Sequence, residues 1–310
     1  MQRIDIHQHF LPPFYLAALA EHGIQLGAEL PFLEWDVQST LALMERHDIA
    51  SAIVSISEPG VYFGDPLSAR NLARRCNEYA ADLIREYPAR FGALAILPLP
   101  GVDAALRELE YALDTLRLDG VVLLSNSDGR YPGDPLFDEL FSELQRRRAV
   151  VFLHPAVPAI NRQLQLDLPP FLVEFVFDTT RAIVNLLYSG TLDRCPDIRF
   201  IAAHAGGTVP YLAHRIAMGQ IMLPGAPQGT ITYLKQLYYD IALSTSPYVL
   251  HSLQELVDAS RLLFGSDYPF APEMATDLVI RGLKRHDGFD EAARAMIERE
   301  NALALFPRFA

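Results

Sequence analysis

Short apolar runs alternate with longer amphipathic segments along the whole chain. Eight of the runs are rich in aliphatic or β-branched residues, and they span residues 3–7, 51–56, 92–97, 120–124, 150–154, 199–204, 237–241 and 262–266. Most of them are almost continuously apolar, which is typical of strands that are covered on both faces of a parallel sheet. The pattern therefore predicts a parallel sheet of eight strands.

The segments between these runs have helical periodicity. The clearest is VDAALRELEYALDTLRLDG, in which Leu106, Leu109, Leu113 and Leu116 recur every three or four residues. The other predicted helices span residues 37–46, 67–86, 135–147, 171–189, 209–222, 248–259, 274–284 and 290–301. Strands that alternate with helices over a chain of 310 residues predict a (β/α)8 TIM barrel, with an open doubly wound sheet as the alternative.

One connection is long for a loop between a strand and a helix. Residues 10–36 follow the first predicted strand and are rich in proline, glycine and aromatic residues. Long connections in compact domains are often functional. We expect residues 10–36 to form a small cap insertion over the barrel mouth, within one domain that spans residues 1–310.

Composition and charge narrow the classes of function. The chain has 26 Lys and Arg residues against 38 Asp and Glu, a net charge of −12, and its positive residues form no block or stripe. Nucleic acid is therefore not an expected partner. There is no membrane-length apolar run, no secretion signal in the first residues, and no glycine-rich phosphate motif. We expect a cytoplasmic protein in which Cys76 and Cys195 are buried or incidental thiols.

Residues that can bind a metal ion or transfer a proton stand at the ends of the predicted strands. His7 and His9 follow the first strand, His154 ends the fifth, His204 the sixth, and Asp267 follows the eighth. In a TIM barrel these ends meet at one rim, where active sites lie. Alternate residues of a strand face the same side, so His7 and His9 can present two imidazoles to one ion. The alternative interpretation makes His204 a packed core histidine and Asp267 a helix cap.

Five segments along the chain carry a family resemblance: DIHQHFLPP, FLHPA, RFIAAHAGGTVPYLAHRI, YYDIALSTSPY and LLFGSDYPF. In this order and approximate spacing they resemble the amidohydrolase superfamily, and more closely its branch of aminocarboxymuconate semialdehyde, γ-resorcylate and 6-methylsalicylate decarboxylases. The resemblance covers essentially the whole chain. It implies a metal site with His7, His9, His154 and Asp267 as ligands, and His204 just outside as the group that handles water or a proton.

The resemblance also bears on the number and kind of metal ions. Binuclear members of the superfamily use a modified lysine after the fourth strand, and DGVVLLSNSDG offers no lysine there. Glu58, after the second strand, is the only obvious substitute, so we expect a single ion. Three imidazoles and one carboxylate suit Zn²⁺, and Mn²⁺ is the alternative.

The resemblance implies a metal-dependent, non-oxidative decarboxylase of a small aromatic or unsaturated carboxylic acid of the salicylate type. His204 and Asp267 would form its acid–base pair. Other relatives use the same apparatus to hydrolyse lactones, amides or carbon–carbon bonds, so a hydrolase is the alternative. A non-catalytic metal-binding protein is a second alternative, which the presence of every expected ligand disfavours.

An anionic substrate requires local positive charge in a chain with a net charge of −12. Arg215 stands where the family sends an arginine across a dimer interface into the neighbouring site, and an ordinary interface salt bridge is the alternative role. The resemblance thus implies a homodimer or a tetramer of dimers. The muconate-type enzyme has a further arginine on its first helix, where WDVQSTLALM offers Thr40. This difference argues against a muconate substrate.

Overall fold

The computed structural model describes residues 2–28, 30–164, 166–223, 227 and 229–310. Eight strands lie side by side in chain order, and each is parallel to the next. They are β1 (Arg3–His9), β4 (Ile49–Ser55), β5 (Phe91–Ile96), β6 (Gly120–Leu124), β7 (Val150–His154), β8 (Arg199–Ala202), β9 (Tyr238–Asp240) and β10 (Leu262–Leu263). Seven of the eight predicted runs overlap their strand closely, and the eighth contributes two residues of regular strand.

Contacts between the first and last strands close this sheet. The backbone N–H of Ile6 donates to the carbonyl of Phe264 at 3.0 Å, and an isolated parallel bridge joins Gln8 to Tyr268. In an open doubly wound sheet the strand order reverses and the two edge strands do not meet. The predicted (β/α)8 barrel is therefore confirmed.

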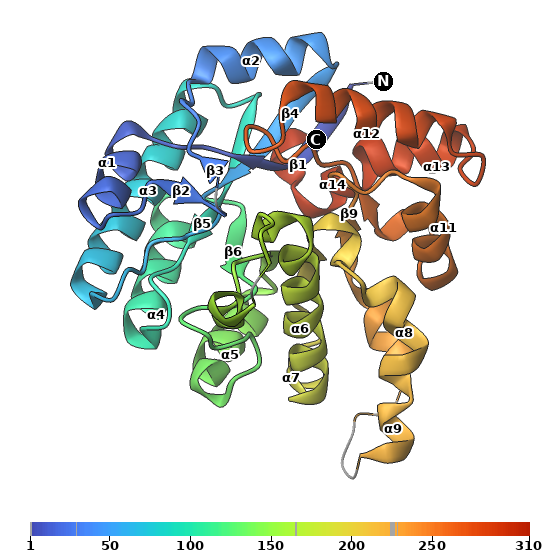
Figure 1. Ribbon diagram of the computed structural model, residues 1–310. Helices are drawn as coiled ribbons and strands as arrows, with labels where there is room; N and C mark the ends of the chain where they lie inside the picture. The colour runs from blue at the N-terminus through green and yellow to red at the C-terminus, as the bar shows by residue number, and fades with distance from the viewer. Residues whose placement is uncertain (1, 29, 165, 224–226, 228) are drawn as a thin grey trace.

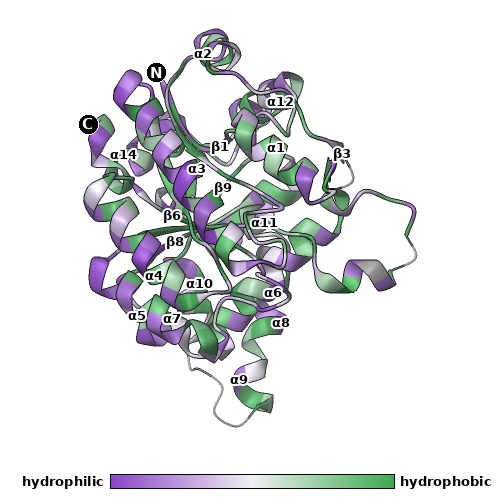
Figure 2. Cartoon of the chain, turned by 90° about the vertical axis from the view of Figure 1, so that its left-hand side faces the viewer, coloured by the Kyte–Doolittle hydropathy of each residue, from purple (hydrophilic) through white to green (hydrophobic). Residues whose placement is uncertain are grey.

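Helices surround the strands on the outside of the barrel (Figure 1). They are α1 (Pro13–Glu21), α2 (Val37–Arg46), α3 (Pro66–Glu86), α4 (Val102–Glu110), α5 (Asp138–Arg147), α6 (Glu174–Tyr188), α7 (Thr191–Arg194), α8 (Val209–Ala217), α9 (Gly219–Met222), α10 (Thr230–Gln236), α11 (Pro247–Leu256), α12 (Glu273–Arg285), α13 (Glu291–Ala295) and α14 (Asn301–Leu305). Figure 2 shows hydrophobic colour on the central strands and both colours on the helices, as expected where helices bury one face against a sheet.

Side-chain caps determine where several helices begin. The carboxylate of Asp36 accepts a hydrogen bond from the backbone N–H of Ser39 at 2.8 Å, and α2 begins directly after it. Asp65 accepts from the N–H of Ser68 in the same way at the start of α3. Each cap satisfies a donor that the first helical turn leaves unpaired.

The predicted strands at 199–204 and 262–266 are longer than the regular strands in the structure. The strand β8 ends at Ala202, and His204 and Ala205 have φ values of 52° and 57°. Asp267 likewise has a φ of 64°. Left-handed backbone cannot continue a strand, so the chain turns at these positions. His204 and Asp267 thus lie in turns just beyond the regular strands.

Residues 10–36, predicted as a cap, contain the helix α1 and a small antiparallel pair, β2 (Leu26–Gly27) and β3 (Leu30–Pro31). The pair forms a separate two-stranded sheet and is not part of the eight-stranded sheet. Gly27 and Ala28 from this segment line a cavity at the barrel mouth. The segment therefore contributes directly to the surroundings of the candidate site.

Both cysteines are buried and free, as expected for structural thiols. Across the described ranges, we find no helix with the combination of length and apolar character that crossing a membrane requires.

Truncation of a core aromatic residue should destabilise the barrel strongly. Phe91 on β5 is fully buried and packs edge-on against Tyr87, with 6.1 Å between ring centroids. We expect Phe91→Ala to lower the free energy of unfolding by about 3–5 kcal/mol in urea denaturation, because the cavity left behind cannot fully collapse. Leu67→Ala, at a side chain that is 56% exposed, should change it by less than about 0.5 kcal/mol. Equal losses would contradict this placement of the core.

Candidate metal centre

The four residues predicted as metal ligands meet inside the carboxyl end of the barrel. His7 and His9 come from the end of β1, His154 from the end of β7, and Asp267 from the turn after β10. One potential ligand atom from each lies within 4.8 Å of those from the others, and all four residues are buried. The barrel thus brings together side chains that are far apart in the sequence.

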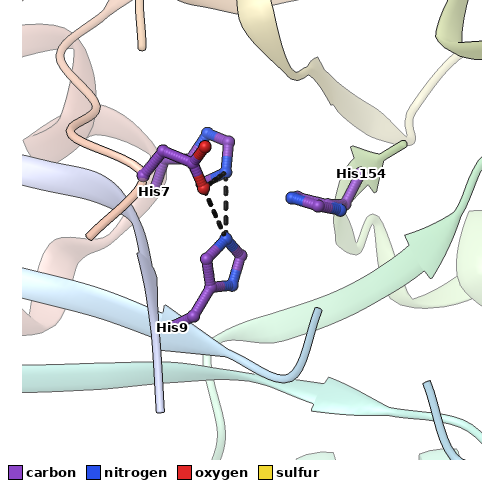
Figure 3. Close-up of side chains that lie close together, drawn as sticks. His7, His9 and His154 are labelled. Carbon is purple, nitrogen blue, oxygen red and sulfur yellow. Dashed lines mark hydrogen bonds and ion pairs between the residues drawn. The ribbon is translucent and has the colours of Figure 1, made fainter. Parts of the chain in front are cut away.

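The ligand atoms point toward one another. The Nε2 atoms of His7 and His9 are 3.1 Å apart. The Oδ1 atom of Asp267 is 3.3 Å from His7 Nε2 and 3.1 Å from His9 Nε2. Figure 3 shows the ring of His154 directed into the same space from the opposite side.

Backbone carbonyls face the other ring nitrogens of two of these histidines. His9 Nδ1 is 3.2 Å from the carbonyl of Ser55, and His154 Nδ1 is 2.8 Å from the carbonyl of Pro155. A carbonyl can only accept, so each contact favours the tautomer with its proton on Nδ1. The Nε2 lone pair then remains available to a cation.

Asp240, the last residue of β9, supports both His7 and His204. Its Oδ2 atom accepts from His7 Nδ1 at 2.9 Å, and its Oδ1 atom accepts from the backbone N–H groups of His204 at 3.2 Å and Ala242 at 2.8 Å. A carboxylate behind a ligating histidine fixes the ring and raises its basicity. The sequence interpretation missed this residue, although its position at the end of a strand was the available signal.

This arrangement fits a single divalent ion. Two imidazole Nε2 atoms and a carboxylate oxygen lie within 3.3 Å of one another, and their lone pairs repel each other unless a proton or a cation lies between them. The third imidazole, from His154, faces the same point. Three nitrogens with one carboxylate form a donor set that Zn²⁺ accepts.

The protonation states of the four groups depend on one another. Burial lowers the pKa of both His9 and His154. Burial also lowers the pKa of His7, but the carboxylates of Asp240 and Asp267 outweigh it and raise that pKa to about 10. Burial opposes ionisation of Asp267, yet the neighbouring His7 holds its pKa well below the usual range. Without an ion the site therefore holds an anionic carboxylate, two neutral imidazoles and a protonated His7, and a bound ion would displace the proton of His7.

His204 lies just outside this group of four. Its Nε2 atom is 3.8 Å from the Oδ2 atom of Asp267, and its Nδ1 atom is 3.1 Å from the carbonyl of Ala242. The left-handed backbone at His204 and Asp267 is uncommon outside glycine and tends to collect at functional sites. Both side chains remain close enough to exchange a proton through a small shift or one water molecule.

A cavity of about 470 Å³ opens beside the candidate ligands. His154, His204 and Asp267 line one part of it, and apolar side chains that include Phe175 and Phe270 line another. A cavity of this size and character is typical of sites for small organic molecules. We refer to it as the inner cavity.

Arg215 does not belong to the inner cavity of its own chain. It is exposed on α8, which leads into the projecting α9 (Figure 1). Among the described residues, no arginine or lysine lines the inner cavity. The structure of one chain thus leaves Arg215 apart from the other predicted site residues.

The whole chain also matches known proteins. Residues 4–308 match the model of the Amidohydro_2 family, described as amidohydrolase. The chain belongs to the amidohydrolase family. This confirms the resemblance identified in the sequence, and it agrees with the closed barrel and with the candidate ligands at its rim.

Similar members of this family include decarboxylases. Decarboxylase yanB of Aspergillus niger is 37% identical over 100% of this chain and 88% of its own. The 6-methylsalicylic acid decarboxylase of Penicillium expansum is 34% identical over 99% of this chain and 97% of its own. A crystal structure of 2,6-dihydroxybenzoate decarboxylase complexed with 2,6-dihydroxybenzoate has a TM-score of 0.83 and 26% identity, and it covers 99% of this chain and 100% of that chain.

Loss of the Asp240 carboxylate should weaken metal binding. An amide has one acceptor oxygen, so Asp240→Asn cannot accept from His7 and from the two backbone N–H groups at once. We expect the affinity for Zn²⁺, measured by chelator competition, to fall about 10- to 100-fold. Asp258→Asn, which changes a cap on an exposed turn, is the matched control and should bind like the wild type. Unchanged affinity in Asp240→Asn would contradict its supporting role.

Proposed function

We propose that this protein is a metal-dependent, non-oxidative decarboxylase of a salicylate-type aromatic acid. The observation that carries the proposal is the inner cavity, in which candidate metal ligands and the His204–Asp267 pair lie beside apolar walls. Its similar relatives act as decarboxylases, including one that acts on 6-methylsalicylic acid. Together these findings support decarboxylation over the hydrolysis of a lactone, an amide or a carbon–carbon bond.

One divalent ion is proposed at His7, His9, His154 and Asp267. The donor set favours Zn²⁺, with Mn²⁺ as the alternative. When bound, the ion would supply the positive charge that orients and polarises the carboxylate of the substrate and the hydroxyl beside it. The carboxylate of Asp240 and the carbonyls of Ser55 and Pro155 accept from the imidazoles and fix the orientation of the three rings.

His204 and Asp267 are proposed to move the proton. Decarboxylation replaces a carbon–carbon bond with a carbon–hydrogen bond, so a proton has to reach the ring carbon from which CO₂ departs. We assign this transfer to Asp267, which would receive the proton from His204, its acid–base partner 3.8 Å away, and pass it to the ring carbon. The rings of Phe175 and Phe270 lie on the same cavity and provide apolar surface for an aromatic substrate.

The proposed assembly is a homodimer or a tetramer of dimers. Near Arg215, the segment from α8 to α9 exposes large apolar side chains, with Tyr211 84% exposed, Ile221 87% exposed and Met222 71% exposed. Exposed apolar surface of this kind favours association with another protein surface. We propose that Arg215 of one subunit reaches the anionic substrate in its neighbour.

Two further features complete the proposal. Residues 10–36 act as a cap, because Gly27 and Ala28 line the inner cavity. We place the protein in the cytoplasm, where its two free cysteines remain reduced.

Metal-loaded protein should release CO₂ from 2-hydroxybenzoates and leave lactones and anilides intact. Product analysis and CO₂ release measure the two reactions on one preparation. His7→Ala and Asp267→Ala should each lose bound metal and slow CO₂ release at least about 100-fold, because a ligand is missing from each and Asp267→Ala also lacks the proton donor. Turnover of a lactone or an amide without any CO₂ would overturn the proposal.

Exchange of subunits tests the role of Arg215. We expect Arg215→Ala to raise KM for the acid at least about tenfold, since a charge-assisted contact is lost, with metal content unchanged. Arg215→Ala and Asp267→Ala subunits, each inactive or weak alone, should regain activity when mixed, because a mixed dimer contains one site with both residues. Mixing without recovery would show that Arg215 does not act on a neighbouring site.

A further inference from the structure

Glu58 lies where two cavities meet. It follows β4 and lines the inner cavity together with His154 and Asp267. It also lines a second cavity of about 820 Å³, which we call the outer cavity. Ala28, from the segment after β2, lines both cavities as well. The two spaces therefore adjoin at Glu58 and Ala28.

The outer cavity offers binding surface that the proposed reaction does not use. Its lining combines apolar side chains such as Leu97 and Val122 with polar ones such as Asn126 and Asn161. Pockets of about 300–1,000 Å³ hold drug-sized molecules. The inner cavity alone, at about 470 Å³, therefore accommodates a single-ring acid. The outer cavity is then available to a substituent on the ring of that acid.

The carboxyl of Glu58 is partly buried and has no cationic partner among the described residues. Burial raises its pKa to about 8; the backbone N–H of Val157 opposes this rise, and the carboxylate of Asp178 adds to it. A carboxyl with this pKa is mostly protonated at pH 7 and can donate a hydrogen bond.

Other titratable groups face Glu58 from the elements around it. Tyr15 of α1 lies close enough for the Glu58 charge to affect its pKa. His22 and Asp128 line the outer cavity with it, and His154 lines the inner cavity. Titration of these side chains can therefore also affect a pH dependence measured at Glu58.

We propose that Glu58 is a specificity-determining residue that donates a hydrogen bond to an oxygen on a ring substituent where the substituent passes from the inner into the outer cavity. The inference rests on the proposed function and narrows its substrate class. The class is an ortho-hydroxy aromatic acid with a further neutral, oxygen-bearing group. A second carboxylate is disfavoured, because Asp128 lines the same outer cavity and would repel it.

The test compares 2-hydroxybenzoates that carry either an acetyl or an isopropenyl group at ring position 4, 5 or 6. The two groups have the same shape, but only the acetyl oxygen accepts a hydrogen bond. At pH 7 the wild type should prefer the acetyl compound at one position by about fivefold, both in Kd by calorimetry and in kcat/KM. The preference should disappear as the pH rises through about 8, because ionised Glu58 cannot donate.

Two substitutions separate hydrogen bonding from shape. Glu58→Leu should remove the preference at every pH. Glu58→Gln should keep it and make it independent of pH between 7 and 9, because an amide donates throughout this range. Asp128→Asn changes the other acid on the outer cavity and should leave the pH dependence in place. Circular dichroism confirms that each variant is folded.

The outcomes distinguish this inference from the proposed function. Equal binding of both compounds at every position, or a preference that survives in Glu58→Leu, would overturn the role of Glu58. Absence of CO₂ from every 2-hydroxybenzoate, unsubstituted or substituted, would overturn decarboxylation instead. The calorimetric comparison would still decide the role of Glu58 in that case, because it requires no turnover.

Discussion

A backbone hydrogen bond from the N–H of Asp267 to the carbonyl of His7, 2.8 Å long, joins the two ends of the barrel at the candidate site. It belongs to the closure between the first and last strands, and it places the carboxylate of Asp267 beside the imidazoles of His7 and His9. Without that closure the ligands from the two ends of the chain would have no common point. The candidate metal centre therefore depends on the same contacts that make the sheet a barrel.

Around the candidate ligands, hydrogen-bond acceptors face the second ring nitrogen of the imidazoles. The backbone is left-handed where the chain leaves the strands β8 and β10. Asp240 is the most connected of these supports, because its two oxygens fix the ring of His7 and the backbone at His204. The uncommon backbone at His204 and Asp267 is thus maintained by contacts from neighbouring strand ends. A rigid frame of this kind holds ligands and proton-transfer groups at distances that the chemistry can use.

The proposed function places the reaction and the selection of the substrate in different parts of the site. In the proposed function, groups at the carboxyl end of the barrel act on the carboxylate and the adjacent hydroxyl, which every salicylate-type acid shares. Glu58 lies farther out, between the inner and outer cavities, where the proposed substrates would differ in their ring substituents. Members of a family can therefore retain one chemistry while residues at the boundary between cavities change which acid is selected.

The alternation of apolar runs and amphipathic helices in the sequence was sufficient to predict the eight strands and the barrel, because this periodicity is local. The residues at the strand ends, together with the ordered motifs, were sufficient to nominate His7, His9, His154, His204 and Asp267. Tertiary structure alone decided that Asp240 supports two of them and that Glu58 lies between two cavities. It also decided where β8 and β10 end. These features arise from barrel closure and from packing between distant segments, which leave no periodic trace in the chain.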